Sequence, residues 1–247
     1  MNILAIGNSF SQDATRYLTQ IAAKRGVYFR TVNLYIGGCP LVRHYNNLIH
    51  DNRAYSLEYG GETTGFYASI RQALRTRKWD VITLQQVSHK SPRYETYQPY
   101  LDVLAAECRA ACPEAKIYIH QTWAYEDGSV KLCEQMKYAK SADMFADIES
   151  AYDTAARAIK ADGVIPSGRT MQNIIESGIV AHRDTFHANL GYGRYALGLT
   201  WFGTVTGESV KDDTFDSLDE PADKKTLGIV RECAERAVKE YRDKIYK

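Results

Sequence analysis

Short apolar runs alternate along this chain with longer segments in which apolar residues recur at helical spacing. The short runs predict strands and the longer segments predict helices. Alternating strands and helices favour a three-layer α/β/α fold, with a mostly parallel, five-stranded sheet covered by helices on both faces. The predicted strands are Ile3–Ile6, Phe29–Tyr35, Val81–Gln85, Ile117–His120 and Val164–Ile165.

The clearest helical periodicity lies in three segments, near residues 101–111, 148–159 and 227–241. One segment, residues 53–67, breaks the alternation with spaced apolar residues around Gly60-Gly61, and it predicts a small hairpin inserted between the second and third strands. No repeat, low-complexity tract or linker divides the 247 residues. We therefore expect residues 1–247 to form a single domain.

Charge argues against several function classes. The chain has 31 basic and 30 acidic residues, a net charge of +1 and no long basic run, which does not favour nucleic acid or a membrane surface as a partner. No apolar stretch has the length of a membrane span. The first strand begins near residue 2, so we expect a cytoplasmic protein, or an exported one whose signal segment is not included in this sequence.

Polar residues and glycines follow each predicted strand. The strand ends are followed by Ser9, Gly37-Gly38, Gln85-Gln86 with Ser88, and His120 to Trp123, and the segment Asp184–His187 comes after the fifth. In a parallel sheet these ends share one edge, where open α/β sheets bind ligands. We therefore expect one crevice lined by these residues.

A serine, a histidine and an aspartate among these residues could supply nucleophilic chemistry. Asp184 and His187 are three residues apart, so the carboxylate can reach the imidazole and leave the other ring nitrogen free for the Ser9 hydroxyl. The plainer interpretation makes Asp184 the cap of a helix over residues 189–206 and His187 a surface residue. For the helix after the first strand, Ser11 is the better candidate cap than Ser9.

Two further positions could hold the negative charge that forms when an ester is attacked. Gly38 has no Cβ, so its N–H can approach a substrate oxygen closely, although it also suits a turn before Pro40. Either Gln85 or Gln86 could donate a side-chain N–H to the same oxygen. Their side chains point in opposite directions along a strand, so only one of them can serve.

These motifs resemble the SGNH, or GDSL-type, hydrolase superfamily. Gly7-Asn8-Ser9-Phe10 is similar to its first block, Gly38 falls where its second-block glycine lies, and Asp184-x-x-His187 is similar to its last block. The resemblance is stronger to a branch of uncharacterised function and covers nearly the whole chain. The stretches that carry it are 37–41, 79–88 and 120–125. It implies the flavodoxin-like SGNH fold.

The third block departs from the common family pattern, because residues 85–89 contain no Gly-x-Asn-Asp. The stretch is similar to the Gln-Gly-Glu-Ser of sialate-type O-acetylesterases, and this match favours Gln85 as an oxyanion donor beside the N–H groups of Ser9 and Gly38. The resemblance implies a serine esterase that cleaves small acyl esters, acetyl first, on a small molecule or carbohydrate, without a cofactor. Gln86, His120, Trp123 and Tyr125 are expected to contact the substrate, with His44 and Tyr45 nearby.

Other functions remain open from the sequence. The chain could act on other acyl substrates as a lipase or thioesterase, or it could be a silent member that binds a ligand. A metal-dependent hydrolase would use Asp184, His187, His182 and His120, but none of the six histidines has the spacing of a metal motif. The five cysteines, Cys39 among them, are expected to be small buried residues, and no metal is expected.

Overall fold

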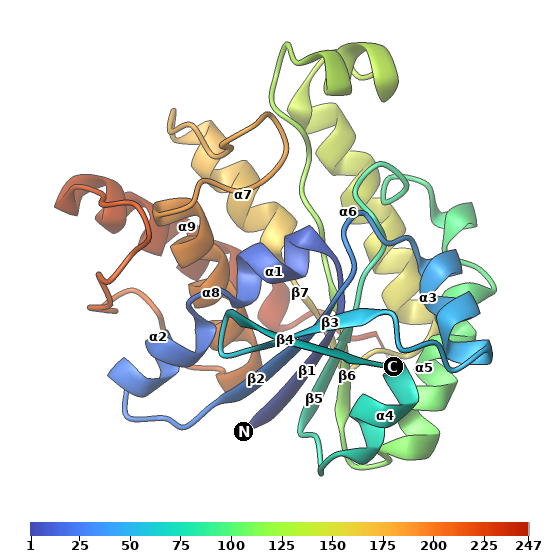
Figure 1. The fold of residues 1–247 in the computed structure, drawn as a ribbon. Helices are drawn as coiled ribbons and strands as arrows, with labels where there is room; N and C mark the ends of the chain where they lie inside the picture. The colour runs from blue at the N-terminus through green and yellow to red at the C-terminus, as the bar shows by residue number, and fades with distance from the viewer. Residues whose placement is uncertain (247) are drawn as a thin grey trace.

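The computed structural model describes residues 1–246, and within them one mixed sheet runs through the centre of the molecule (Figure 1). Its strand order is β4-β3-β2-β1-β5-β6-β7. The strands are β1 (Asn2–Gly7), β2 (Arg30–Tyr35), β3 (Tyr55–Tyr59), β4 (Glu62–Ala68), β5 (Val81–Leu84), β6 (Lys116–His120) and β7 (Gly163–Ile165).

The five strands predicted from the sequence form the parallel part of this sheet. β2, β1, β5, β6 and β7 pair in parallel, each within a residue or two of its predicted bounds. The α/β class and the mostly parallel sheet are therefore confirmed. The sheet has seven strands in residues 1–246 instead of five, because the hairpin of β3 and β4 pairs antiparallel with the edge of β2.

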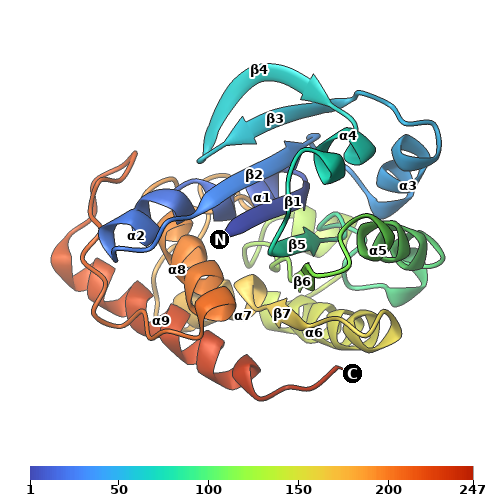
Figure 2. The same cartoon turned by 90° about the horizontal axis from the view of Figure 1, so that it is seen from below.

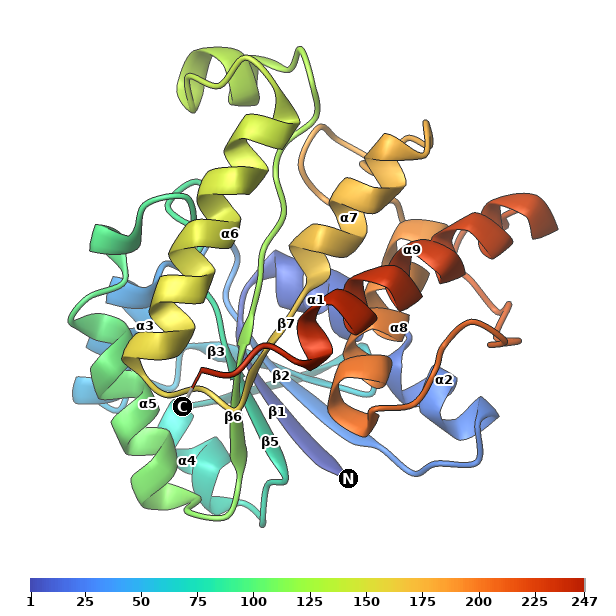
Figure 3. The same cartoon turned by 180° about the vertical axis from the view of Figure 1, so that it is seen from behind.

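Helices cover both faces of the sheet (Figure 2). On one face α1 and α2 pack against α8, and α9 lies against α7 and α8 (Figure 3); on the other, α3 and α4 pack against α5, and α6 lies beside β6 and β7. None of the helices in residues 1–246 has the length and apolarity to cross a membrane. Their bounds are α1 (Ser9–Thr15), α2 (Leu18–Lys24), α3 (Leu41–Ile49), α4 (Ile70–Arg75), α5 (Tyr100–Ala111), α6 (Ser141–Ala158), α7 (Ser167–Glu176), α8 (Tyr192–Thr206) and α9 (Lys224–Arg242), with a 3₁₀ turn at Tyr94–Thr96 and a π-helical turn at Lys131–Gln135.

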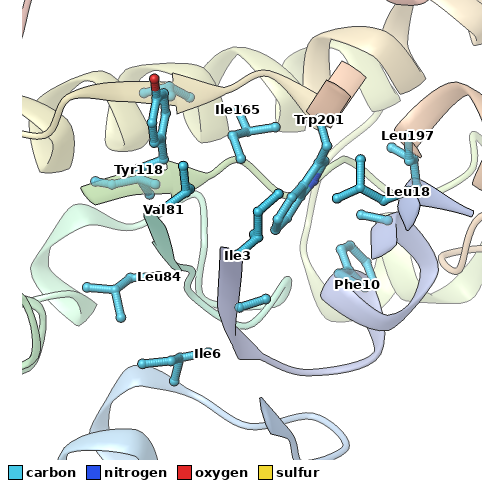
Figure 4. Packing of buried hydrophobic residues seen from close by; sticks show 14 of the residues in the cluster. Ile3, Ile6, Phe10, Leu18, Val81, Leu84, Tyr118, Ile165, Leu197 and Trp201 are labelled. Atoms are coloured by element: carbon cyan, nitrogen blue, oxygen red, sulfur yellow. The ribbon is translucent and has the colours of Figure 1, made fainter. Parts of the chain in front are cut away.

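The centre of the core is β1, which is buried on both faces. Its apolar run reads as continuous because a parallel strand between two helical layers has no solvent side. Ile3 and Ile6 are at most 1% exposed, and Trp201 of α8 packs near Ile3 with no exposed surface (Figure 4). The strand that precedes Ser9 is therefore rigidly held.

The strand order creates a ligand-binding edge beside β1. β1 has β2 on one side and β5 on the other. The chain leaves β1 toward the layer of α1 and α2, and it leaves β5 toward the opposite layer, which contains α5. Such a switch in direction opens a crevice outside the carboxyl ends of the strands. Ser9 follows β1, Gly38 follows β2 and Ser88 follows β5, so the three segments meet at this crevice.

The turn of the hairpin between β3 and β4 packs against the end of α1. Gly61 has φ +88° and its Cα lies so close to α1 that a Cβ would meet the Arg16 carbonyl oxygen at 2.1 Å. The Arg16 side chain continues the contact, because its guanidinium donates to the Gly61 carbonyl and pairs with Glu62. The turn therefore requires a residue without a side chain.

Gly61→Ala should lower the free energy of unfolding by at least about 2 kcal/mol, because left-handed strain and a backbone clash act together. Gly65→Ala is the matched control, since φ there is +76° but nothing lies within 4 Å of the added Cβ. It should cost only the strain, about 1 kcal/mol. Urea unfolding of both variants measures the difference, and equal losses would show that the Arg16 contact contributes nothing.

Candidate active site

Ser9, His187 and Asp184 form a continuous chain of hydrogen bonds across 178 residues of sequence. The Ser9 Oγ lies 2.8 Å from His187 Nε2, and His187 Nδ1 lies 2.8 Å from Asp184 Oδ2. Ser9 is the first residue of α1, directly after the turn that follows β1, while the other two come from the loop before α8. The structure thus brings together the three side chains that the sequence singled out.

The protonation pattern of this chain follows from its geometry. With Nδ1–H donating to the Asp184 carboxylate, a neutral His187 ring offers Nε2 as the acceptor for the Ser9 hydroxyl. Partial burial alone would raise the pKa of the Asp184 carboxyl, but hydrogen bonds from the His187 ring and N–H and from the Phe186 N–H hold that pKa below its usual range. Asp184 is therefore charged at neutral pH and fixes the imidazole's tautomer.

The loop that carries Asp184 and His187 is a tight, strained turn. Thr185 between them has φ +74°, a left-handed conformation that a β-branched residue adopts only at a cost of about 1–2 kcal/mol. Its carbonyl accepts from the Glu126 N–H at 2.8 Å, and the Arg183 N–H donates to the His187 carbonyl at 3.0 Å. Asp184 Oδ1 accepts from the His187 N–H, so Asp184 closes this turn and does not cap α8.

Asn8, not Ser11, caps the helix that begins at Ser9. The Asn8 Oδ1 accepts from the Phe10 N–H at 3.0 Å, as expected for a cap. The Ser11 hydroxyl instead donates within the core, 2.8 Å from both the Asn8 carbonyl and Asn33 Oδ1. The prediction that Ser11 caps this helix is wrong, because Asn8 leaves the strand with the extended backbone that a cap needs, whereas Ser11 is already inside the helix.

Aromatic rings pack against the loop that carries His187. Phe10 and Trp123 stack with ring centroids 3.9 Å apart, and the His187 ring meets the Phe10 ring edge-on at 5.9 Å. The Trp123 Nε1–H donates to the Phe186 carbonyl at 2.7 Å. Trp123, expected to contact the substrate, is fully buried and instead holds the residue before His187 in place.

A buried ion cluster joins α1, which carries Ser9, to the loop that carries His187. The sequence analysis did not identify this cluster. Asp13 lies one turn after Ser9 on α1 and its carboxylate is completely buried. It accepts from Arg183 at 3.0 Å, from Arg194 at 2.9 Å and from the Ala188 N–H at 3.2 Å. These contacts fasten the loop that carries His187 to the helix that begins at Ser9.

A cavity of about 600 Å³ opens at Ser9 and His187. This volume is within the range of small-ligand sites. Gly38 and Tyr125 are the predicted site residues that line it besides Ser9 and His187, and the Tyr125 hydroxyl lies 2.8 Å from the Ser88 Oγ. The other lining residues are Asn8, Phe10, Tyr35, Gly37, Val87, Ser88, His89, Arg93, Lys131, Gln135, Met136 and Phe186.

Neither glutamine after β5 reaches this cavity, which corrects the expected oxyanion role of Gln85. The Gln85 amide lies behind Asn8, donating to Asn8 Oδ1 at 2.7 Å and accepting at 2.8 Å from His120. Gln86 points the other way, as strand alternation requires, and accepts from the Leu41 N–H at 3.0 Å. Both side chains are at most 1% exposed, so Gln86 does not contact a substrate in the cavity either.

His120 is also turned into the core and is corrected as a substrate contact. Its Nε2 lies 3.0 Å from the Ser167 Oγ, and burial lowers the pKa of its imidazole to about 3. His44 is likewise buried, with Nδ1 2.9 Å from the Tyr55 hydroxyl, and Tyr45 packs on Tyr100. Polar aromatic residues after strands therefore stabilise the core here more often than they line the crevice.

The remaining sequence candidates have structural roles. The His182 Nε2–H donates to the Ala124 carbonyl at 3.0 Å, and burial lowers the pKa of its ring to about 4. Burial raises the pKa of the Cys39 thiol to about 12, so this residue is a small buried side chain and no nucleophile. Within residues 1–246 no group of three or more His, Cys, Asp or Glu side chains is arranged to hold a metal ion.

Comparison with known proteins places the chain in a family. Residues 2–237 match the model of a domain of unknown function, DUF4886, and the chain belongs to that family. A search of curated proteins finds no match. A crystal structure of a DUF4886 protein from Bacteroides uniformis is 32% identical and superposes with a TM-score of 0.89, covering 99% of this chain and 96% of that one.

More distant structures identify the fold. A candidate SGNH hydrolase from Slackia heliotrinireducens is 23% identical, with a TM-score of 0.60 over 83% of this chain and 98% of that one. An acetylxylan esterase from Geobacillus stearothermophilus is 13% identical, with a TM-score of 0.56 over 84% and 94% of the two chains. The chain therefore has the fold of the SGNH hydrolases, as its motifs indicated.

Asp13→Asn should lower the free energy of unfolding by about 3 kcal/mol, because it leaves two guanidinium groups beside a buried neutral amide. The matched control is Glu62→Gln, which removes a 70% exposed carboxylate from Arg16 and should change stability by less than about 0.5 kcal/mol. Urea unfolding checks both variants. A loss for Asp13→Asn no larger than that for Glu62→Gln would contradict a clamping role for the cluster.

Proposed function

We propose that this protein is a serine esterase in which Ser9 is the nucleophile, His187 the general base and Asp184 the residue that orients it. The observation that carries the proposal is the pair of 2.8 Å contacts from Ser9 to His187 and from His187 to Asp184, beside an open cavity. Such a chain of contacts activates a hydroxyl that is otherwise a weak nucleophile. The SGNH hydrolase fold supports the same reaction class.

The reaction proceeds in two halves. The Ser9 Oγ attacks the ester carbonyl carbon while its proton passes to His187 Nε2, and the carbonyl oxygen becomes an oxyanion. When the intermediate collapses, the bond to the alcohol oxygen breaks and His187 returns the proton to that oxygen. Water then attacks the acyl-enzyme with His187 again as base, releasing the carboxylic acid and restoring Ser9.

The N–H groups of Ser9 and Gly38 are the proposed donors to the oxyanion. Ser9 is the first residue of α1, and the first N–H groups of a helix have no partner within it. Gly38 has φ +60° and lines the cavity, with no atom within 4 Å of a Cβ built on it. The Gln85 side chain is hydrogen-bonded to Asn8 and His120, so we propose that the two backbone N–H groups bind the oxyanion without it.

The substrate we propose has a small acyl group, acetyl first, on a polar alcohol such as a carbohydrate. Apolar side chains of Phe10, Val87, Met136 and Phe186 enclose part of the 600 Å³ cavity, and Tyr125 with Ser88 adds hydroxyl groups to its wall. This volume suits a compact ester. The acetylxylan esterase of the same fold acts on substrate of this kind, which agrees with the proposal.

Ser9→Ala should lower kcat for 4-nitrophenyl acetate by at least about a thousandfold, because the nucleophile is lost. A fluorophosphonate should label the wild-type protein at Ser9, as located by peptide mass spectrometry, and should not label the variant. Unchanged turnover by Ser9→Ala would disprove the assignment. A wild-type protein that neither turns over the ester nor takes the label would instead be a ligand-binding member of the fold.

The proposed acetyl substrate predicts a preference for short acyl chains. We expect kcat/KM for 4-nitrophenyl acetate to exceed that for the octanoate by about tenfold or more, because a long apolar chain would cover the polar groups of Ser88, Tyr125 and Arg93 on the cavity wall. Initial rates at matched concentrations, below the micelle limit of the octanoate, make the comparison. A preference for octanoate would contradict the proposed acetyl substrate and would favour a lipase or thioesterase.

A further inference from the structure

The wall of the active-site cavity carries positive charge and no carboxylate. Among its lining residues in the described part of the chain are Arg93, Lys131 and the two histidines His89 and His187, but no aspartate or glutamate. The chain as a whole is almost neutral, with 31 basic and 30 acidic residues. The excess of cations at the cavity is therefore local, and it is not a property of a basic protein.

Lys131 is held close to the reacting histidine. It begins the π-helical turn Lys131–Gln135, and its ammonium lies 4.3 Å from the centre of the Phe186 ring. That ring is 3.9 Å from the His187 ring. No carboxylate oxygen of residues 1–246 lies within 4.0 Å of the Lys131 nitrogen, so a cation–π contact positions the charge without neutralising it.

Arg93 approaches the same cavity from the segment that follows β5. Its guanidinium donates to the His89 carbonyl at 3.4 Å, a long contact, and it forms no ion pair within the described residues. Both the Arg93 and His89 side chains are exposed at the cavity rim. A guanidinium so placed can still donate two parallel N–H groups to a carboxylate.

The charges act on one another across the cavity. Partial burial lowers the pKa of the His89 imidazole, and the cations of Lys90, Arg93 and Lys131 lower it further. His89 therefore tends to stay neutral while Arg93 and Lys131 keep their charge. An anion that entered the cavity would meet two cations and no competing carboxylate on the wall.

We propose that the ester substrate carries a carboxylate, which Arg93 and Lys131 bind while Ser9 attacks the ester carbonyl. This inference rests on the esterase function proposed above and specifies its substrate class as an anionic ester. The shared chemistry is the carboxylate, which could belong to the alcohol portion, as in an acetylated sugar acid, or to the acyl portion. Exposed charges of this kind favour anionic over neutral substrates, and they raise the rate at which an anion binds from solution.

Two matched pairs of esters separate these sources. For the alcohol portion, 4-acetoxybenzoate is compared with its neutral methyl ester; for the acyl portion, phenyl hydrogen succinate is compared with phenyl methyl succinate. Release of 4-hydroxybenzoate, its methyl ester or phenol gives kcat/KM for each. The quantity measured is the ratio of anionic to neutral kcat/KM within a pair, and comparison between variants cancels the intrinsic reactivity of each ester.

We expect the ratio of one pair to depend on Arg93 and Lys131, and the pair that does so locates the carboxylate. Arg93→Gln and Lys131→Gln should each lower that ratio by about fivefold, the effect of one partly exposed ion pair. Arg93→Glu should lower it further through repulsion. The matched control is Lys116→Gln, which should leave the ratio unchanged. Lys116 is an exposed lysine at the start of β6, the end of the strand that lies away from the cavity.

The inference would be overturned, with the esterase function intact, if the neutral esters are hydrolysed but both glutamine variants keep the wild-type ratio in both pairs. A wild-type ratio that falls in neither pair from 50 to 500 mM salt would also contradict it, because screening must reduce attraction between exposed charges. If the wild-type protein hydrolyses none of the four esters, the proposed function itself fails.

Discussion

The contact on which the active-site geometry depends is that of the Asp13 carboxylate with Arg183 and Arg194. A fully buried carboxylate is tolerable only when its charge is matched and its oxygens accept hydrogen bonds, and Asp13 meets both conditions with residues from the loop and from α8. In doing so it joins the helix that begins with Ser9 to a loop about 170 residues later in the chain. Together with the contacts of Phe10 and Trp123 to the His187 loop, this attachment holds Ser9 and His187 within hydrogen-bond distance.

Uncharged groups support the opposite side of the turn that carries Ser9. Asn8, Gln85, His120 and Ser167 form a buried line of amide, imidazole and hydroxyl groups, each bonded to the next. Burial keeps His120 neutral by lowering its pKa to about 3, so this line contains no ion that would need a counter-ion. The turn at Ser9 is therefore held by an ionic contact to α8 on one side and by a network of neutral hydrogen-bonded side chains on the other.

The local pattern of the chain was enough to predict much of the fold and the central residues of the site. The parallel strands followed from apolar runs, and the placement of Ser9, Gly38, Asp184 and His187 followed from their positions after those runs. The prediction failed for the direction of polar side chains at the carboxyl ends of β5 and β6. Gln85 and His120 turn inward because buried polar groups there bond one another across neighbouring strands, and no local pattern shows whether such a partner exists. Asp13 was missed for a similar reason, since its arginines are distant in sequence.

The strained turn from Arg183 to Ala188 holds two of the three candidate site residues as one unit. His187 and Asp184 lie on the same six residues, locked by the Asp184 contacts to the backbone and by the bridge from His182 to Ala188. The distance between the His187 and Asp184 side chains is therefore set within one short segment. The distance from His187 to Ser9 depends instead on contacts between segments far apart in the chain, so it is the more sensitive of the two to a change in how the turn packs on α1.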